Sequence, residues 1–285
     1  MLELRVEHAG VALAASYSPA GEKAIVALHG AGEGTRDGAL YEHLHRVLPP
    51  AGIGVATFDR RGEGDSGGDG SRGRFRVQAE DALAVAEAVE ADRVGLWGFS
   101  QGAWVAPLAA TMSDRVAFLV LVASTGVSPA EQMAYATAEQ LRQAGYDEAV
   151  VVRALELRRR FDERVRRGGQ DPALSADLRA ALDEPWFGHL FMPPVLLDDE
   201  ARALWIEEMD FDPRPVVRRV RVPALCFFGA ADSWTPVEES VRAWREERPD
   251  AEIVVLAGAE HDLTLPDGTL VPEYERRLVD WLARV

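Results

Sequence analysis

Short apolar runs alternate along this chain with longer amphipathic segments, in which hydrophobic and polar residues are mixed. Residues 2–7 and 11–17 place apolar residues at every second position, which predicts a two-stranded hairpin at a sheet edge. Further strands are predicted from short apolar runs at residues 23–28, 53–58, 94–97 and 118–122. The segments between them predict helices at residues 38–48, 77–90 and 103–112. Strands and helices that alternate in this way form a mostly parallel sheet with helices on both faces, so the expected fold class is α/β.

The alternation stops between residues 128 and 214. This stretch contains no convincing strand, and its helical segments are expected at residues 131–144, 148–166, 175–182 and 199–209. The earlier pattern then resumes, with strands at residues 224–228 and 253–256 and helices at residues 237–247 and 273–283. We therefore expect a core of residues 1–127 and 215–285. Residues 128–214 are expected to form a helical cap over the carboxyl edge of the sheet, where loops commonly carry function.

The pentapeptide Gly98-Phe99-Ser100-Gln101-Gly102 connects a predicted strand directly to a predicted helix. A serine in the pattern G-x-S-x-G at such a junction is typical of a nucleophile elbow. The tight turn strains the backbone of the serine, and glycines two positions before and after it avoid clashes with neighbouring backbone. The turn exposes the hydroxyl of Ser100 at the carboxyl end of a strand. The N–H of Gln101 lies at a helix start, where a developing negative charge is stabilised.

A serine hydroxyl becomes an effective nucleophile only when a base takes its proton and a carboxylate orients that base. Among the six histidines, His261 lies just after a predicted strand, in the loop before the last helix. Asp232 follows the strand at residues 224–228, so its carboxylate is expected at the same edge of the sheet. Glu260 and Asp262 flank His261 and stay as alternatives to Asp232 for the acid.

The remaining histidines and serines lack a comparable setting. His29 ends a strand, but the Gly30-Ala31-Gly32 that follows it better suits a loop that offers backbone N–H groups. No turn presents Ser66 or Ser124 as a nucleophile. Structural or surface roles are expected for the other histidines, which are His8, His43, His45 and His189.

These motifs together resemble the α/β-hydrolase superfamily along nearly the whole chain, and within it the bacterial esterase and serine-aminopeptidase-like branch with a helical cap. The resemblance is carried by His29-Gly30-Ala31-Gly32, Asp59-Arg60-Arg61-Gly62-Glu63-Gly64-Asp65-Ser66, the Ser100 pentapeptide, the Asp232 turn and the His261 loop. It implies that Ser100 attacks an acyl carbon, that His261 transfers the proton and that Asp232 orients His261. It also implies that the backbone N–H groups of Gln101 and Ala31 form the oxyanion hole.

A dinucleotide site is the competing interpretation of one stretch. Residues 62–67 match G-x-G-x-x-G after a strand, but Gly68-Asp69-Gly70-Ser71 continues as a loop and opens no apolar helix. No dinucleotide cofactor is therefore expected, and the sequence suggests no metal site. The arginines of Arg158-Arg159-Arg160 and Arg166-Arg167 alternate with acidic residues, which favours a solvated helix face.

Composition narrows the classes of partner. The net charge of −16 argues against nucleic acid and anionic membranes, because both select basic surfaces. The single cysteine, Cys226, lies in an apolar run and is expected to be a buried thiol. The N-terminus lacks a signal-peptide core and no apolar run reaches the ~20 residues of a membrane span, so a cytoplasmic location is expected.

The sequence therefore predicts a serine hydrolase that cleaves small-molecule carboxylic esters through an acyl-enzyme. A pocket lined by apolar residues of the cap would favour an apolar substrate moiety, although most of these residues are expected to pack the cap helices on each other. They are Tyr135, Trp186, Phe187, Phe191, Met192, Trp205, Met209 and Phe211. An aminopeptidase, a thioesterase or an acyl transferase would use the same triad, and a non-catalytic binding protein would use the same fold. An aminopeptidase would need an acidic group for the substrate amine, for which Glu207, Glu208 and Asp210 are candidates.

Overall fold

The structure is a computed structural model that describes residues 1–71 and 73–285. The chain divides into two compact units. The first, which we call the sheet unit, comprises Met1–Gly126, Pro213–Asp232 and Val237–Val285. The second, the helical unit, comprises Val127–Asp212 and Ser233–Pro236.

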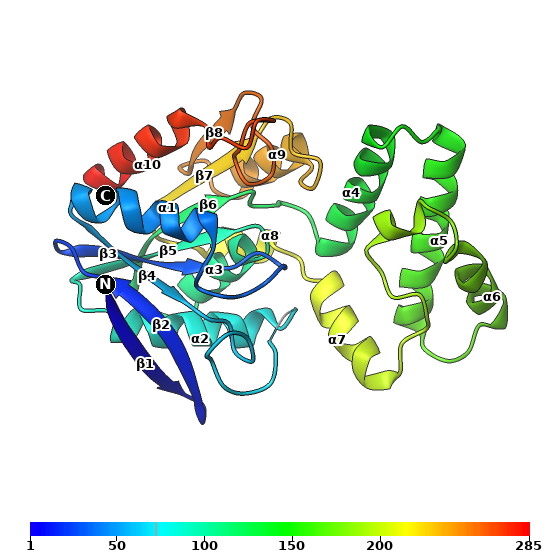
Figure 1. The fold of residues 1–285 in the computed structure, drawn as a ribbon, viewed down its shortest axis with the longest axis horizontal. Coiled ribbons are helices and arrows are strands. Elements are labelled where there is room, and N and C mark those ends of the chain that lie inside the picture. The colour runs from blue at the N-terminus through cyan, green and yellow to red at the C-terminus, as the bar shows by residue number, and fades with distance from the viewer. Residues whose placement is uncertain (72) are drawn as a thin grey trace. The chain divides into compact units, whose positions relative to one another are not determined.

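The sheet unit is built on a mixed sheet whose strands among the described residues follow the order β1-β2-β4-β3-β5-β6-β7-β8 (Figure 1). Their bounds are β1 Leu2–His8, β2 Val11–Ser18, β3 Lys23–Leu28, β4 Ile53–Phe58, β5 Arg93–Phe99, β6 Val116–Val122, β7 Ala224–Gly229 and β8 Glu252–Leu256. Strands β1 and β2 pair antiparallel at one edge, β2 pairs antiparallel with β4, and all other pairs are parallel. The predicted fold class, including the edge hairpin, is confirmed.

Helices connect the parallel strands of this unit. They are α1 Ala39–Val47, α2 Phe75–Ala88, α3 Gly102–Ala110, α8 Arg214–Arg219, α9 Val237–Glu247 and α10 Pro272–Arg284, with a short 3₁₀ turn at Pro49–Ala51. Helix α8 was not among the predicted elements, because six residues complete fewer than two turns and show no helical period. Helices α2 and α3 contact each other and the central strand β3.

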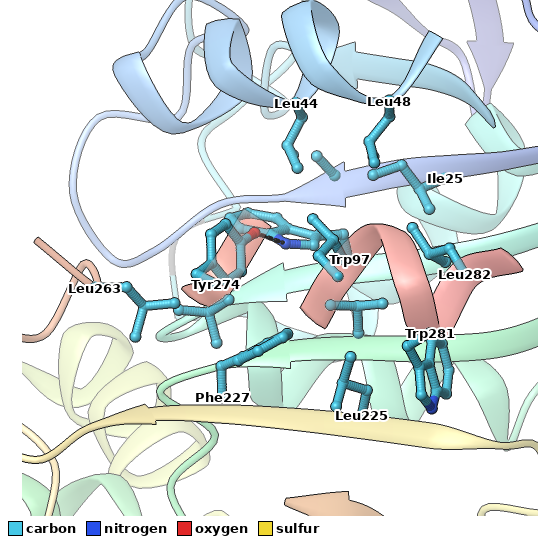
Figure 2. Packing of buried hydrophobic residues seen from close by; sticks show 14 of the residues in the cluster. Ile25, Leu44, Leu48, Trp97, Leu225, Phe227, Leu263, Tyr274, Trp281 and Leu282 are labelled. Carbon is cyan, nitrogen blue, oxygen red and sulfur yellow. Dashed lines mark hydrogen bonds between the residues drawn. The ribbon is translucent and has the colours of Figure 1, made fainter. Parts of the chain in front are cut away.

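Helices α1 and α10 pack against a single apolar cluster on the sheet (Figure 2). Ile25 and Trp97 contribute from neighbouring strands, and Leu44 of α1 and Leu278 of α10 cover them. The indole N–H of Trp97 donates to the hydroxyl of Tyr274 at 3.0 Å, which satisfies two polar groups inside the cluster. This packing fixes the strands whose carboxyl ends carry the candidate site.

The helical unit consists of α4 Pro129–Gln143, α5 Glu148–Arg167, α6 Pro172–Ala181, the 3₁₀ turn Phe187–Leu190 and α7 Asp199–Met209. Helix α5 contacts α4, α6 and α7 (Figure 1). Side chains cap the N-termini of all four α-helices through Ser128, Asp147, Asp171 and Asp198, each of which accepts a backbone N–H three residues ahead. Local sequence signals therefore define where each helix begins.

The expectation of a solvated face for the arginines of α5 is wrong at one position. Arg159 and Arg160 are partly exposed, but Arg158 is buried, with 1% of its surface exposed. Its Nη1 donates to the carbonyl of Leu190, and its Nε lies 3.7 Å from a carboxylate oxygen of Asp162. The sequence did not reveal this burial, because an arginine and an aspartate four residues apart are also the usual pattern of an exposed helix face. Here the pair lies on the face that packs inward.

None of the helices in the described ranges combines the length and the apolar character that a membrane crossing requires. The thiol of Cys226 is buried in β7, as predicted, and burial raises its pKa.

Candidate active site

Ser100 stands between β5 and α3 with a backbone φ of 52°, a left-handed conformation that is strained for any residue with a side chain. The flanking glycines make this turn possible. A Cβ at Gly102 would lie 2.6 Å from the carbonyl oxygen of Leu28, and a Cβ at Gly98 would lie 2.3 Å from the carbonyl oxygen of Gly102. Both distances are far below van der Waals contact. The local geometry is therefore that of the nucleophile elbow predicted from the pentapeptide.

His261 binds both of the other side chains that the sequence singled out. Its Nε2 lies 2.9 Å from Oγ of Ser100, and its Nδ1 lies 2.8 Å from Oδ2 of Asp232. A carboxylate only accepts hydrogen bonds, so Nδ1–H donates to Asp232 and Nε2 is left to accept the hydroxyl proton of Ser100. The Asp232 side chain is completely buried, whereas that of His261 is 18% exposed. The arrangement suits a base that must meet a substrate and an acid that need only orient the base.

The turn after β7 and the loop after β8 approach each other closely, which brings Asp232 to His261. A Cβ at Gly229 would lie 2.2 Å from the carbonyl oxygen of Glu260, so only glycine fits there. The backbone N–H of Ala231 donates to the carbonyl of Ala259 at 2.8 Å. The alternative acid Asp262 instead accepts hydrogen bonds from the N–H and the hydroxyl of Thr264.

The two residues proposed for the oxyanion hole come from the loop after β3 and from the start of α3. Gln101 is the N-cap of α3, and its side-chain oxygen accepts a hydrogen bond from Gln78 at 3.1 Å. Ala31 follows Gly30, and a Cβ at Gly30 would lie 3.5 Å from Cβ of Ser100. The loop after β3 therefore runs directly beside the nucleophile candidate.

The serines considered as rivals are held in the core. Oγ of Ser66 donates to the carbonyl of Asp59 and accepts the N–H of Ala14, so it ties a loop to β2. Oγ of Ser124 donates to the carbonyl of Ala103. Each hydroxyl has a structural role, in agreement with the absence of a presenting turn in the sequence.

His29 is buried, with 3% of its surface exposed, beneath the loop after β3. Burial, and after it the Arg60 cation, lower the pKa of His29 from 6.5 to about 3. His29 is therefore neutral at physiological pH. Its ring lies edge-on to Tyr41 and Phe58, so it packs as part of the core.

The buried imidazole of His29 should make the stability of the protein depend on pH. Between pH 6.5 and pH 3 the unfolded chain binds a proton at His29 that the folded chain does not, so the free energy of unfolding falls as pH decreases. Between pH 6.5 and pH 4.5 this residue alone costs about 2 to 3 kcal/mol. Urea unfolding across this range should show a weaker pH dependence in His29→Gln than in the parent. Coincident slopes for His29→Gln and the parent would contradict the assignment.

Several of the apolar residues considered for a substrate pocket pack inside the helical unit instead. Trp186 is buried in its core, and Phe187, Met192 and Trp205 pack against that core. Phe191 is 38% exposed, and its ring lies 4.7 Å from that of Trp234. Of the acidic candidates for an aminopeptidase, Asp210 binds the guanidinium of Arg166.

Comparison with known proteins identifies the family. A model of the alpha/beta hydrolase family matches residues 25–272, which include all five site residues named above. The chain belongs to this family.

Among the residues that the structure describes, no group of three or more His, Cys, Asp or Glu side chains is placed to hold a metal ion.

Individual relatives of this hydrolase-family chain match it only in part. An uncharacterized 31.7 kDa protein of Escherichia coli, from the traX-finO intergenic region, is 26% identical over 203 residues, which is 66% of each chain. The lysophosphatidylserine lipase ABHD12 of Gallus gallus is 42% identical over 86 residues, 29% of this chain and 22% of the lipase. The match therefore spans just under two thirds of the first relative and about a fifth of the second.

Among solved structures, the esterase PF2001 of Pyrococcus furiosus aligns with 99% of this chain and 90% of its own, with a TM-score of 0.67. The two sequences are 17% identical. At this identity the likeness concerns the fold.

Proposed function

We propose that this protein is a serine hydrolase that cleaves carboxylic esters of small molecules through an acyl-enzyme. The observation that carries the proposal is the double contact of His261, whose two ring nitrogens lie within hydrogen-bond distance of Ser100 and Asp232. A nucleophile, a base and an orienting acid in this order are the minimum set for acyl transfer by serine.

In the proposed reaction His261 Nε2 takes the proton of Ser100 as Oγ attacks the ester carbonyl carbon. The carbonyl oxygen becomes an oxyanion, which the backbone N–H groups of Ala31 and Gln101 stabilise together with the N-terminus of α3. Asp232 stabilises the imidazolium that forms. The imidazolium returns its proton to the leaving alcohol as the C–O bond breaks, which leaves an acyl group on Ser100. A water molecule, deprotonated by His261, then releases the carboxylic acid by the same steps.

We further propose that residues 128–214 act as a cap that selects the substrate. This stretch is rich in helix and carries exposed apolar residues such as Phe191. A partly apolar acyl or alcohol group is the matching substrate class. The buried position of Trp186 and the pairing of Asp210 with Arg166 leave fewer pocket residues than the sequence offered, and they disfavour Asp210 as an anchor for a substrate amine.

The Ser100→Ala variant tests the proposal. It should fold as the parent does and lose at least about 10⁴-fold in kcat towards p-nitrophenyl esters, because it lacks the hydroxyl proposed to form the acyl-enzyme. A fluorophosphonate should label the parent on Ser100 and leave the variant unlabelled, whereas Ser124→Ala should be labelled normally. Aminoacyl anilides, assayed in parallel, should be poorer substrates than the esters. Retained turnover in Ser100→Ala, or no covalent adduct on the parent, would refute the proposed function.

A further inference from the structure

We propose that Arg60 is a positioning residue for the oxyanion hole. It fixes the direction of the Ala31 N–H and strengthens this N–H as a hydrogen-bond donor. The inference rests on the proposed function, because it gives Ala31 a task only if an oxyanion forms at Ser100. It assigns a role to a buried cation that the proton transfer itself does not use.

Arg60 follows β4, and only 2% of its surface is exposed. Its Nη2 donates to the carbonyl of Gly30, and its Nη1 donates to the carbonyl of Gly32 at 3.3 Å. Nη1 also donates to Oε1 of Glu63 at 2.9 Å. One guanidinium thus holds the backbone carbonyls on both sides of Ala31.

The hydrogen bond to Gly30 bears directly on Ala31, because the carbonyl of Gly30 and the N–H of Ala31 belong to the same peptide group. A trans peptide is planar, and its C=O and N–H point in opposite directions. When Arg60 holds the carbonyl oxygen from one side, the N–H must therefore point to the other. The positive charge also polarises the peptide group, which makes the N–H a stronger donor.

The loop so held lies beside the nucleophile candidate. A Cβ at Gly30 would lie 3.5 Å from Cβ of Ser100 and 3.2 Å from the ring of Phe99. A rotation of the peptide between Gly30 and Ala31 would thus turn a donor towards or away from the space next to Ser100. Preorganised donors contribute to catalysis because they need no reorientation when the charge develops.

Further hydrogen bonds from the segment after β4 hold the rest of this loop. The N–H of Arg60 donates to the carbonyl of Gly34 at 2.6 Å, and the N–H of Gly34 donates to Oε2 of Glu63 at 2.7 Å. The N–H of Arg36 donates to Oδ1 of Asp59 at 2.7 Å. Glu63 therefore neutralises the buried guanidinium and anchors the same loop, which offsets the cost of burying the charge.

Steady-state kinetics of Arg60→Met test the role. Methionine keeps the apolar stem but cannot hold the two carbonyls, so kcat should fall about 10- to 100-fold, less than for the loss of a whole oxyanion donor. KM should change by less than about threefold, because the ester carbonyl of the ground state uses the N–H only weakly. Arg60→Lys can still donate to the Gly30 carbonyl, so it should recover part of the lost kcat.

Inhibitor affinities separate positioning from general structural support. A trifluoromethyl ketone forms an oxyanion on Ser100, and its affinity should fall in Arg60→Met by the same factor as kcat/KM. The affinity for the product alcohol, which forms no oxyanion, should stay within about twofold. The matched control is Arg61→Met. The guanidinium of Arg61 donates to Asp81 on α2 at 2.9 Å, so this variant should be less stable than the parent but should keep the parental ratio of the two affinities.

Unchanged kcat and ketone affinity in folded Arg60→Met would overturn the inference, and so would an equal loss for the ketone and the alcohol. If Arg60→Met does not fold, the same ratio is measured in Arg60→Lys, where a selective loss for the ketone supports the role and an unchanged ratio overturns it. Failure of the proposed function looks different, since the parent protein itself would then lack esterase activity and a covalent adduct at Ser100.

Discussion

The Asp232→Asn variant should hydrolyse esters with a kcat about 10⁴-fold below that of the parent. The Asp232 carboxylate is fully buried and lies 2.8 Å from Nδ1 of His261, so it determines which ring nitrogen carries the proton. An asparagine that offers its N–H₂ to Nδ1 holds the imidazole in the wrong tautomer, and Nε2 then cannot accept the proton of Ser100. Initial rates with a p-nitrophenyl ester, together with circular dichroism to confirm folding, measure this effect.

The matched control for this variant is Asp262→Asn, which changes the acid beside His261 in the same way. The carboxylate of Asp262 accepts hydrogen bonds from Thr264, whose backbone nitrogen lies 3.1 Å away. Its kcat should stay within about threefold of the parent. The assignment of the acid is wrong if Asp262→Asn loses activity and Asp232→Asn keeps more than a tenth of it.

The strands and most helices could be predicted from the sequence because each core strand is a short apolar run bounded by a turn. The strand Lys23–Leu28 ends just before the turn that begins at His29-Gly30. The strand Ala224–Gly229 ends at the glycine that the His261 loop approaches. The proximity of the three candidate side chains could be predicted for the same reason. Parallel strands present their carboxyl ends at one edge, so the loops that follow β5, β7 and β8 are expected at the same edge of the sheet.

Contacts that depend on the path of a loop could not be predicted in this way. Arg60 stands in a motif that the sequence singled out, yet nothing in the letters indicates that its guanidinium reaches back to Gly30. That contact requires β3 and β4 to be neighbours and the loop after β3 to fold over the end of β4. Similarly, the sequence alone did not distinguish which apolar residues of 128–214 would line a pocket and which, like Trp186 and Trp205, pack within the helical unit.

The buried arginine of α5 leads to a large expected change in stability. Arg158→Met should lower the free energy of unfolding of the helical unit by about 3 to 5 kcal/mol, because Asp162 would be left as a buried charge without its cation. Burial raises the pKa of Asp162, and Arg158 opposes that rise. In the variant the carboxyl should therefore titrate higher still. A carboxyl whose folded pKa is raised stabilises the fold at low pH and loses this contribution as pH increases, so the defect should shrink from pH 7 to pH 5.

Hydrogen exchange of amides in α5, combined with urea unfolding, measures this effect within the helical unit. Arg159→Met is the matched control: Arg159 pairs with Glu156 and Glu163 on the surface, where water and salt screen ion pairs, so its loss should leave the free energy of unfolding close to that of the parent. The double variant Arg158→Met with Asp162→Asn removes both charges and keeps an acceptor for the indole of Trp205, which donates to Asp162 at 3.3 Å. It should recover at least half of the lost stability, because the cost comes from an uncompensated charge more than from the pair itself. If the double variant were no more stable than Arg158→Met, the lost stability would instead come from the hydrogen bond of Arg158 to the Leu190 carbonyl.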